Sequence, residues 1–241
     1  MDADSTTIVW AVCTVFFAVM VQGIVGFGSA LIAAPLLIRL LSPEVAIPLI
    51  TLVGVAQQSV LWTAYRKAFN WQATARLTLA SIVTIPAGVV LLTDGSERMV
   101  LGLLGLITIG YALWELARFQ LPELASPRWA YLFGGIAGLL SGAYNISGPP
   151  VVLYANCRRW PPEEFKGNLQ GFFLVNSALV LLSRGLQQQL TSQVWLLGIA
   201  ALPAIALGGM AGVRLARRLD PHRFRQLILL LLIFLGGSLL R

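Results

Sequence analysis

Long apolar runs recur from one end of the chain to the other. Each run lacks Asp, Glu, Lys and Arg, and polar stretches separate it from the next. The six clearest runs span about 45–64, 77–93, 99–114, 167–183, 193–213 and 226–240. About 20 apolar residues cross a bilayer as a helix, and the shorter runs would draw on flanking residues. The pattern therefore predicts an all-α polytopic membrane protein.

The composition supports this prediction. Of the 241 residues, 57% are hydrophobic and only 11% are charged, whereas roughly a quarter of the residues in a soluble domain are charged. The first ten residues lack a basic stretch and a small-residue cleavage site, so we expect no removable signal peptide. We attribute the net charge of +7 to loop Lys and Arg that set the orientation in the membrane, and we expect no nucleic-acid partner.

Two further apolar segments, 7–41 and 129–157, contain helix-breaking residues near their middles. They include GIVGFGSALIAAPLL in the first segment and GLLSGAYNISGPPVV in the second. Glycines permit such breaks, and the proline pair after Gly148 can begin a new helix, whose first turn needs no N–H partners. Non-helical backbone survives in a membrane only where it lines protein or a wet cavity. We therefore predict two half-helices in each segment, the second ones beginning near Ser29 and Gly148.

The two broken segments align when the sequence is shifted against itself by 119 residues. The same shift places Pro43–Glu44 on Pro162–Glu163, and Gln57–Gln58 on Asn176–Ser177. A proline near the first helical position with an acid in the first turn favours a helix start at both places. The chain therefore divides into a first repeat at 1–119, a connecting loop at 120–128 and a second repeat at 129–241.

The charge distribution distinguishes two topologies for the broken segments. If each segment crosses the membrane once, the 17 Lys and Arg divide almost evenly between the two faces. If each is a hairpin without net crossing, one face keeps only Arg39, Arg98, Arg184 and Arg241, and the other face collects the rest. The positive-inside rule expects such an asymmetry, so we predict hairpins, with both termini outside the cytoplasm. Each half then makes three net crossings of the membrane, an odd number. The second half therefore enters from the opposite face, which makes the halves inverted repeats. Re-entrant and fully spanning hairpins share this parity, and both stay open.

Polar residues gather at the two breaks and in the helices that follow them. The second half-helix of each segment would point its N-terminal N–H groups and positive dipole end into the protein, and such ends bind anions. The expected substrate-binding residues are Gln22, Gly26, Gly28, Ser29, Gln57, Ser141, Tyr144, Asn145, Ser147, Gly148 and Asn176. Close helix packing is the competing interpretation for any one of the small residues, and the hypothesis depends on the cluster recurring in both halves.

Other kinds of site find little support in the pattern. No Asp or Glu lies deep in a predicted span, which disfavours a cation carrier or a proton relay. Nothing deep in a span is basic either, so we expect dipoles and neutral hydrogen bonds to hold an anion. One histidine, His222, and two cysteines in apolar segments, Cys13 and Cys157, predict neither a metal site nor a cofactor. No Ser–base combination or deep carboxylate pair indicates an enzyme.

At the two broken segments the chain resembles the sulfite exporter TauE/SafE family, also called the 4-toluene sulfonate uptake permease family. That family carries a Gly-rich signature followed by a Pro in each half, and the resemblance extends over essentially the whole chain. The family often has three glycines where Gly28–Ser29–Ala30 and Ser147–Gly148–Pro149 stand, and often a glycine in place of Asn145. The resemblance implies transport of sulfite, sulfoacetate or other sulfonates across a bacterial cytoplasmic membrane.

We therefore expect a secondary transporter that binds a small sulfur-containing anion between the two half-helix N-termini. Movement of one group of helices against another would expose the anion alternately to the two sides. Tyr144 would pack against an organic tail. An anion channel built on the same two helix ends is the alternative. The expected partners are the anion and the lipid bilayer, and a homodimer is one assembly open to the chain.

Overall fold

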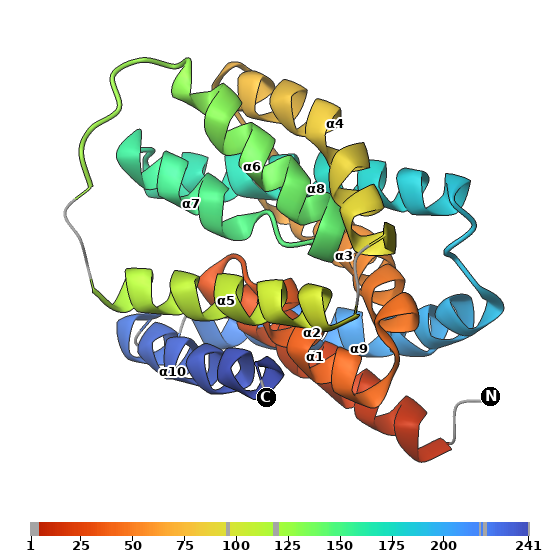
Figure 1. Ribbon diagram of the computed structural model, residues 1–241. Helices are drawn as coiled ribbons and strands as arrows, with labels where there is room; N and C mark the ends of the chain where they lie inside the picture. Colours follow the sequence, from red (N-terminus) through yellow and green to blue (C-terminus); the bar gives the residue numbers. More distant parts are fainter. Residues whose placement is uncertain (1–4, 95–96, 118–120, 217, 219–220, 241) are drawn as a thin grey trace. The chain divides into compact units, whose positions relative to one another are not determined.

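The computed structural model describes residues 5–94, 97–117, 121–216, 218 and 221–240 (Figure 1). The described residues form only helices, and no strand occurs among them. In chain order the elements are α1 (Ser5–Val25), α2 (Ser29–Leu40), α3 (Pro43–Tyr65), the 3-10 turn η1 (Arg66–Ala68), α4 (Trp71–Asp94), α5 (Glu97–Leu116), α6 (Trp129–Tyr144), α7 (Gly148–Cys157), α8 (Pro162–Leu186), α9 (Ser192–Ala216) and α10 (Pro221–Leu239). Arg118, Arg217 and Arg241, which enter the charge count above, and the predicted repeat boundary at 119–120 lie outside the described residues.

The all-α polytopic architecture predicted from the apolar runs is confirmed. Within the described part of the chain, six helices are long and apolar enough to cross a membrane, namely α1, α3, α4, α5, α8 and α9. The described apolar part of α10, Gln226–Leu239, is shorter. The two predicted helix starts are also correct, because α3 begins at Pro43 and α8 begins at Pro162.

Both predicted breaks are present, and special backbone conformations make them. Gly26 and Gly28 have φ angles of 96° and 100°, a left-handed region that glycine adopts without steric cost. In the second half, Asn145 has a φ angle of 56° and ends α6 as a left-handed C-terminal cap. The Asn145 and Ile146 N–H groups then donate to the carbonyls of Ser141 and Leu140. The second half-helices begin at Ser29 and Gly148, as predicted.

Each broken segment doubles back on itself. Along the second segment, the Phe133 ring in α6 packs on the Tyr154 ring in α7, with centroids 5.7 Å apart. The Leu124 N–H, just before α6, donates to the carbonyl of Cys157 at the end of α7 over 3.0 Å. The short half-helices α2 and α7 have 12 and 10 residues, about 18 and 15 Å of helix. Neither length alone spans a hydrocarbon core of about 30 Å, whereas α1 is long enough to cross a membrane.

The helices form two compact units that do not coincide with the two halves of the chain. The first unit comprises Met1–Val53, Gly95–Phe119 and Leu190–Arg241, and the second comprises Gly54–Asp94 and Gln120–Gln189. The first unit therefore contains α1, α2, α5, α9 and α10, and the second contains η1, α4, α6, α7 and α8 (Figure 1). Helix α3 contributes residues to both units. Each unit thus draws helices from both sequence repeats.

In the second unit, α4 and α6 run parallel and touch through glycines. A Cβ atom added at Gly134 would lie 2.7 Å from the Leu77 Cα atom, and one at Gly138 would lie 2.6 Å from the Ser81 Cα atom. Helices approach this closely only where a side chain is missing. Helix α8 also runs parallel to α4. The Asn70 N–H, just before α4, donates to the Asn168 side-chain oxygen over 2.7 Å, and farther along both helices Ile85 and Val89 pack with Val180.

The first unit repeats this arrangement with other helices. Helices α1 and α9 run parallel, because Gly208 lies against Phe16 and Gly212 lies against Gly23. Helices α5 and α10 run antiparallel instead. Gly105 near the start of α5 approaches Gly236 and Leu240 near the end of α10, whereas Tyr111, later in α5, shares a hollow with Ile228 and Leu232. The pairs α1–α9 and α4–α6 occupy corresponding positions in the two halves.

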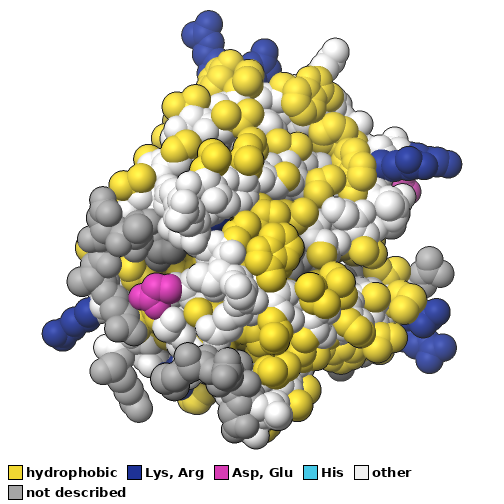
Figure 2. Space-filling model, turned by 90° about the vertical axis from the view of Figure 1, so that its right-hand side faces the viewer, with side chains coloured by type: hydrophobic (Ala, Val, Ile, Leu, Met, Phe, Trp, Pro, Cys, Tyr) yellow, Lys and Arg dark blue, Asp and Glu magenta, His cyan; other side chains and the backbone are white. Residues whose placement is uncertain are grey.

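Much of the visible surface is apolar, and Figure 2 shows Lys and Arg side chains at its margins. Large apolar side chains in the middle of several helices are exposed to more than half of their area, including Val83, Leu106, Ile199 and Leu207. Such a surface suits a hydrocarbon surrounding.

Gly138→Ala should destabilise the protein, because the new methyl group would lie within 2.6 Å of the Ser81 backbone. We expect a loss of about 1–3 kcal/mol, seen as a lower thermal unfolding midpoint in detergent. Gly135→Ala is the matched control on the same helix, where an added Cβ would meet only the Thr84 methyl group at 3.8 Å. Equal midpoints for the two variants would contradict the glycine-mediated packing of α4 on α6.

Candidate functional site

The tip of the first hairpin is closed by a side-chain amide. The Gln22 side-chain oxygen accepts hydrogen bonds from the Ser29 N–H over 3.2 Å and from the Ser29 hydroxyl over 2.5 Å. Gln22 in α1 thus satisfies one of the N–H groups at the start of α2, which have no partner within the helix. The Gln22 amide nitrogen is buried and, among the described residues, makes no hydrogen bond. This nitrogen can donate to a bound acceptor.

The two half-helix N-termini differ in the N–H groups that they offer. A helix start leaves about four N–H groups without an intrahelical partner. At α2 these belong to Gly28, Ser29, Ala30 and Leu31, and Gln22 already takes one of them. At α7 two of the four positions are Pro149 and Pro150, which have no N–H. The second tip therefore presents fewer backbone donors than the first and depends more on side chains.

At the second tip three helices meet around Asn145. The Ser177 hydroxyl of α8 lies 3.5 Å from the Asn145 side-chain oxygen. A Cβ atom at Gly54 of α3 would lie 2.6 Å from the Asn145 side-chain nitrogen and 3.4 Å from the Ser177 hydroxyl. Gly54 therefore has no room for a side chain. Gln57 and Gln58 follow three and four residues later, so they lie on the same face of α3 as Gly54.

Several buried polar atoms in this unit make no hydrogen bond to any described residue. They are both polar atoms of the Gln57 amide, the Gln58 and Asn176 side-chain oxygens and the Ser141 hydroxyl. All four residues are at most 5% exposed. An unsatisfied polar group in a protein interior costs about 1–3 kcal/mol, and native structures contain few of them. A cluster of such groups beside a helix break favours a polar ligand.

One buried charge was not expected from the sequence, although it lies near the end of a predicted span and not deep within it. Arg184 lies in α8 and is 0% exposed. One terminal nitrogen of its guanidinium donates to the carbonyls of Gly142 and Ala143, over 2.6 and 3.1 Å. The other terminal nitrogen donates to the Gln189 side-chain oxygen over 2.7 Å. The sequence did not indicate this burial, because α8 continues beyond its apolar run and carries Arg184 on the buried face that also carries Asn176 and Val180.

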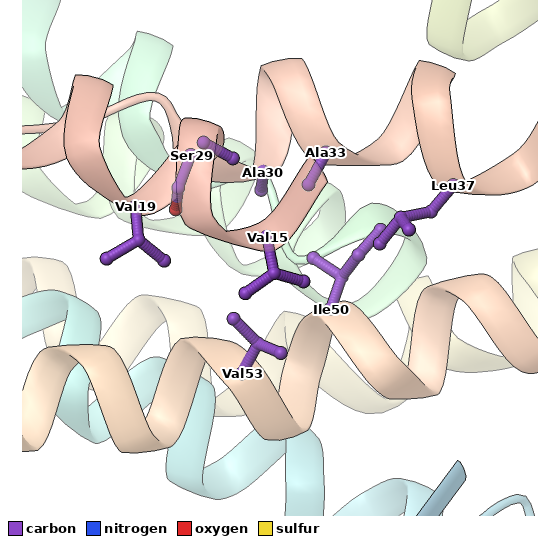
Figure 3. A pocket seen from close by; sticks show the side chains of 9 residues that line it. Val15, Val19, Ser29, Ala30, Ala33, Leu37, Ile50 and Val53 are labelled. Carbon is purple, nitrogen blue, oxygen red and sulfur yellow. The ribbon is translucent and has the colours of Figure 1, made fainter. Parts of the chain in front are cut away.

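Beside the first tip there is a narrow apolar hollow, shown in Figure 3. Helices α1 and α2 and the start of α3 form it, and Ser29 is the one hydroxyl side chain among its lining residues. Val15, Val19, Ile50 and Val53 supply branched apolar walls. The hollow thus joins a polar helix start to an apolar surface.

The sequence-predicted site residues fall into two groups, one in each unit. Gln22 and Ser29 are brought into contact in the first unit, where Gly26 and Gly28 form the break between them. In the second unit, Asn145 joins Ser177 and Gly54, and Ser141, Tyr144 and Ser147 are buried in the same hairpin. The meeting of both groups around one anion stays a prediction. Sequence reasoning missed Gly54 and Arg184.

Metal binding has no support among the described residues. No group of three or more His, Cys, Asp or Glu side chains comes together there. The buried polar and charged residues include amides, hydroxyls and Arg184, but no Asp or Glu of the described part. Hydrogen-bond donors and one full positive charge suit a negatively charged ligand better than a cation.

Comparison with known proteins identifies relatives over most of the chain. The family model described as sulfite exporter TauE/SafE matches residues 11–239. A protein of Cupriavidus necator named "Probable sulfite/organosulfonate exporter TauE" is 24% identical over 225 residues, which cover 91% of this chain and 88% of that protein. A protein of Comamonas testosteroni named "Probable inner membrane transporter protein TsaS" is 29% identical over 176 residues, 70% of this chain and 72% of that protein. No solved structure matches the chain.

Gly54→Ala should destabilise the protein through Asn145, since the added methyl group would lie 2.6 Å from the Asn145 side-chain nitrogen. We expect a cost of about 1–3 kcal/mol in an unfolding experiment. Asn145→Gly removes that nitrogen and keeps a residue that tolerates the left-handed backbone. In the Asn145→Gly background, Gly54→Ala should therefore cost little. Identical costs in both backgrounds would show that the two residues do not interact.

Proposed function

We propose that this chain, which belongs to the sulfite exporter TauE/SafE family, is a secondary transporter that moves sulfur-containing anions across the cytoplasmic membrane by alternating access. Sulfite, sulfoacetate and other sulfonates form the proposed substrate class. The names of two relatives, a sulfite/organosulfonate exporter and an inner membrane transporter, support this class and this location. We assign no catalytic step to the protein.

The buried polar atoms without partners carry the proposal. They occur at the two helix breaks and on the helices that pack beside them, in positions that correspond in the two halves of the chain. Gln22 and Gln57 contribute their amide nitrogens and Ser141 its hydroxyl group, which can donate to an anion, whereas the Asn176 atom without a partner is its side-chain oxygen, which can only accept. A bound anion would accept hydrogen bonds from the amide nitrogens and the hydroxyl group, and its release would leave them in a water-filled path.

The hydrogen-bond donors at the two tips favour an anion with several equivalent oxygens. A sulfonate or sulfite presents three oxygens that accept hydrogen bonds from N–H groups at a helix N-terminus and from amide side chains. We propose that Gly28 and Ser29 at the first tip, and Asn145, Ser147 and Gly148 at the second, supply these contacts. Neutral donors bind an anion without the full strength of an ion pair, which suits a carrier that must also release its substrate.

The helix directions support inverted repeats. Suppose that α6 and α7 together make no net crossing. Helix α5 then runs opposite to α4, and α8 runs opposite to α5. Helix α8 is therefore parallel to α4, which agrees with their packing. If α1 and α2 also make no net crossing, α9 runs parallel to α1, which their glycine contacts require. A single crossing in either hairpin would reverse one of these relations. Each half then crosses the membrane an odd number of times, so the second half is inverted.

The uneven distribution of Lys and Arg indicates how this topology is oriented in the membrane. With both hairpins returning to the side on which they start, most Lys and Arg lie on one face. We propose that this face is cytoplasmic and that both termini lie on the opposite side. Trp129 at the start of α6 and Arg158 after the end of α7 would then lie at the cytoplasmic interface. Arg158 donates to the carbonyls of Leu124 and Ala125 over 2.6 and 2.8 Å, which ties the two ends of this hairpin together.

A reporter fused to the C-terminus tests the topology. We expect alkaline phosphatase, which is active only outside the cytoplasm, to be active there, and green fluorescent protein to be dark. Fusions in the connecting loop at 120–128 should give the opposite result, because this loop follows an odd number of crossings. A fluorescent C-terminal fusion would overturn the hairpin topology.

Binding of sulfonates tests the substrate class. Purified protein should be stabilised against heat by isethionate or sulfoacetate, and much less by the matched carboxylates 3-hydroxypropionate and malonate. Asn145→Gly and Ser147→Ala should each weaken sulfonate binding roughly tenfold or more, because each removes a hydrogen bond to a charged ligand. Asn156→Ala, at an exposed position of α7, is the control and should bind as the wild type does.

Two results would count against the proposal. An equal response to sulfonates and carboxylates, or no response to either, would reject the substrate class. Large unitary currents without counterflow in proteoliposomes would replace the carrier by an anion channel with the same binding groups.

A further inference from the structure

Arg184 is a buried charge without a buried counter-charge. Its side chain is 0% exposed, and its three hydrogen bonds go to two backbone carbonyls and one amide oxygen, all of them neutral. No carboxylate of the described residues pairs with it, and its Nε N–H is buried without a partner among them. A buried charge with only neutral partners is costly, and within membrane segments such residues commonly mark a pathway for an ion.

The position of Arg184 links it to the second hairpin tip. Gly142 and Ala143, whose carbonyls it binds, belong to the last turn of α6. Carbonyls in the last turn of a helix lack intrahelical partners and carry the negative end of the helix dipole, so a cation there is favourable. Asn145, Ser147 and Gly148 follow within six residues of Gly142. Arg184 therefore fixes the backbone from which the proposed anion contacts begin.

The second tip also needs a positive charge more than the first tip does, because it has fewer backbone N–H donors. Pro149 and Pro150 remove two N–H donors from the start of α7, whereas α2 has none of its first four positions occupied by proline. Shifting the sequence by 119 residues places Arg184 on Tyr65, so the first half has no equivalent charge. The buried guanidinium thus occurs in the half whose helix start offers fewer donors.

We propose that Arg184 is a positioning and specificity-determining residue, whose fixed positive charge draws the anion to the α6–α7 tip while its hydrogen bonds hold that tip in shape. This inference rests on the proposed function. The charge acts on the ligand in proportion to the ligand's own charge. Arg184 therefore strengthens the binding of a doubly charged anion more than that of a singly charged anion of similar size, a difference that a purely structural residue would not produce.

Gln189→Glu changes the charge beside the guanidinium, and it also removes the hydrogen bond that the Gln189 amide nitrogen donates to the Gln187 side-chain oxygen over 2.9 Å. The new carboxylate would stand where the Gln189 side-chain oxygen now accepts a hydrogen bond from Arg184 over 2.7 Å. It would neutralise the guanidinium and leave the bonds to Gly142 and Ala143 in place. The thermal midpoint without ligand should stay the same or rise. Calorimetric titration should show sulfoacetate, with two charges, binding about tenfold more weakly and isethionate, with one charge, about threefold more weakly.

Two further variants complete the experiment. Gln188→Glu adds the same charge to an exposed neighbouring side chain, where solvent screens it, so both dissociation constants should stay within about twofold of the wild type. Arg184→Lys keeps the charge and loses the forked geometry, so both ligands should bind more weakly but in an unchanged ratio.

The results of these titrations test the role of the Arg184 charge separately from the proposed function. Equal fold losses for the two ligands in Gln189→Glu, or no loss, would overturn the role of the charge and leave the proposed function standing. A changed ratio in Arg184→Lys would overturn it as well. A wild-type protein that binds neither ligand would overturn the proposed function itself, and this inference with it.

Discussion

The structure depends on the rule that a backbone polar group inside a membrane must find a partner within the protein. The chain breaks two helices within an apolar segment, and each break leaves N–H and C=O groups that no helix satisfies. At the first break, the Gln22 amide accepts from the Ser29 N–H, so a neutral acceptor caps the starting half-helix. At the second, the Arg184 guanidinium donates to the carbonyls of the ending half-helix. The two breaks are thus stabilised differently, one by an acceptor at the start of α2 and the other by a donor at the end of α6.

Backbone chemistry made the breaks predictable from the sequence. Only a few residues adopt the left-handed conformation, and Gly26, Gly28 and Asn145 are of these types. A proline can begin a helix and cannot continue one easily, which located the starts of α3, α7 and α8 within one or two residues. These signals are local, since each depends on the φ angle or the N–H group of the residue itself. The prediction of two sequence repeats rests on the same local signals, because they recur at one spacing.

The residues that sequence reasoning missed act through distant partners. Gly54 stands in an ordinary apolar run, and only the approach of Asn145 from another helix explains why it lacks a side chain. Arg184 stands just beyond an apolar run, where an arginine usually marks a membrane interface, and its burial depends on where α6 ends. The pairing of α1 with α9 and of α4 with α6 was equally hidden, because Gly and Ser spacing does not state which helix is the partner.

Helices of one half of the chain pack on helices of the other half, and this has a consequence for dividing the chain. Glycines on α9 and α6 lie against α1 and α4, each of which belongs to the other half of the chain. A half of the chain on its own would leave such glycines without the helix that covers them here, so it would have to meet the other half to bury them. Covalent joining turns that encounter into an intramolecular event at high effective concentration. Two halves made as separate chains would therefore have to find each other in the membrane before these helix pairs could form.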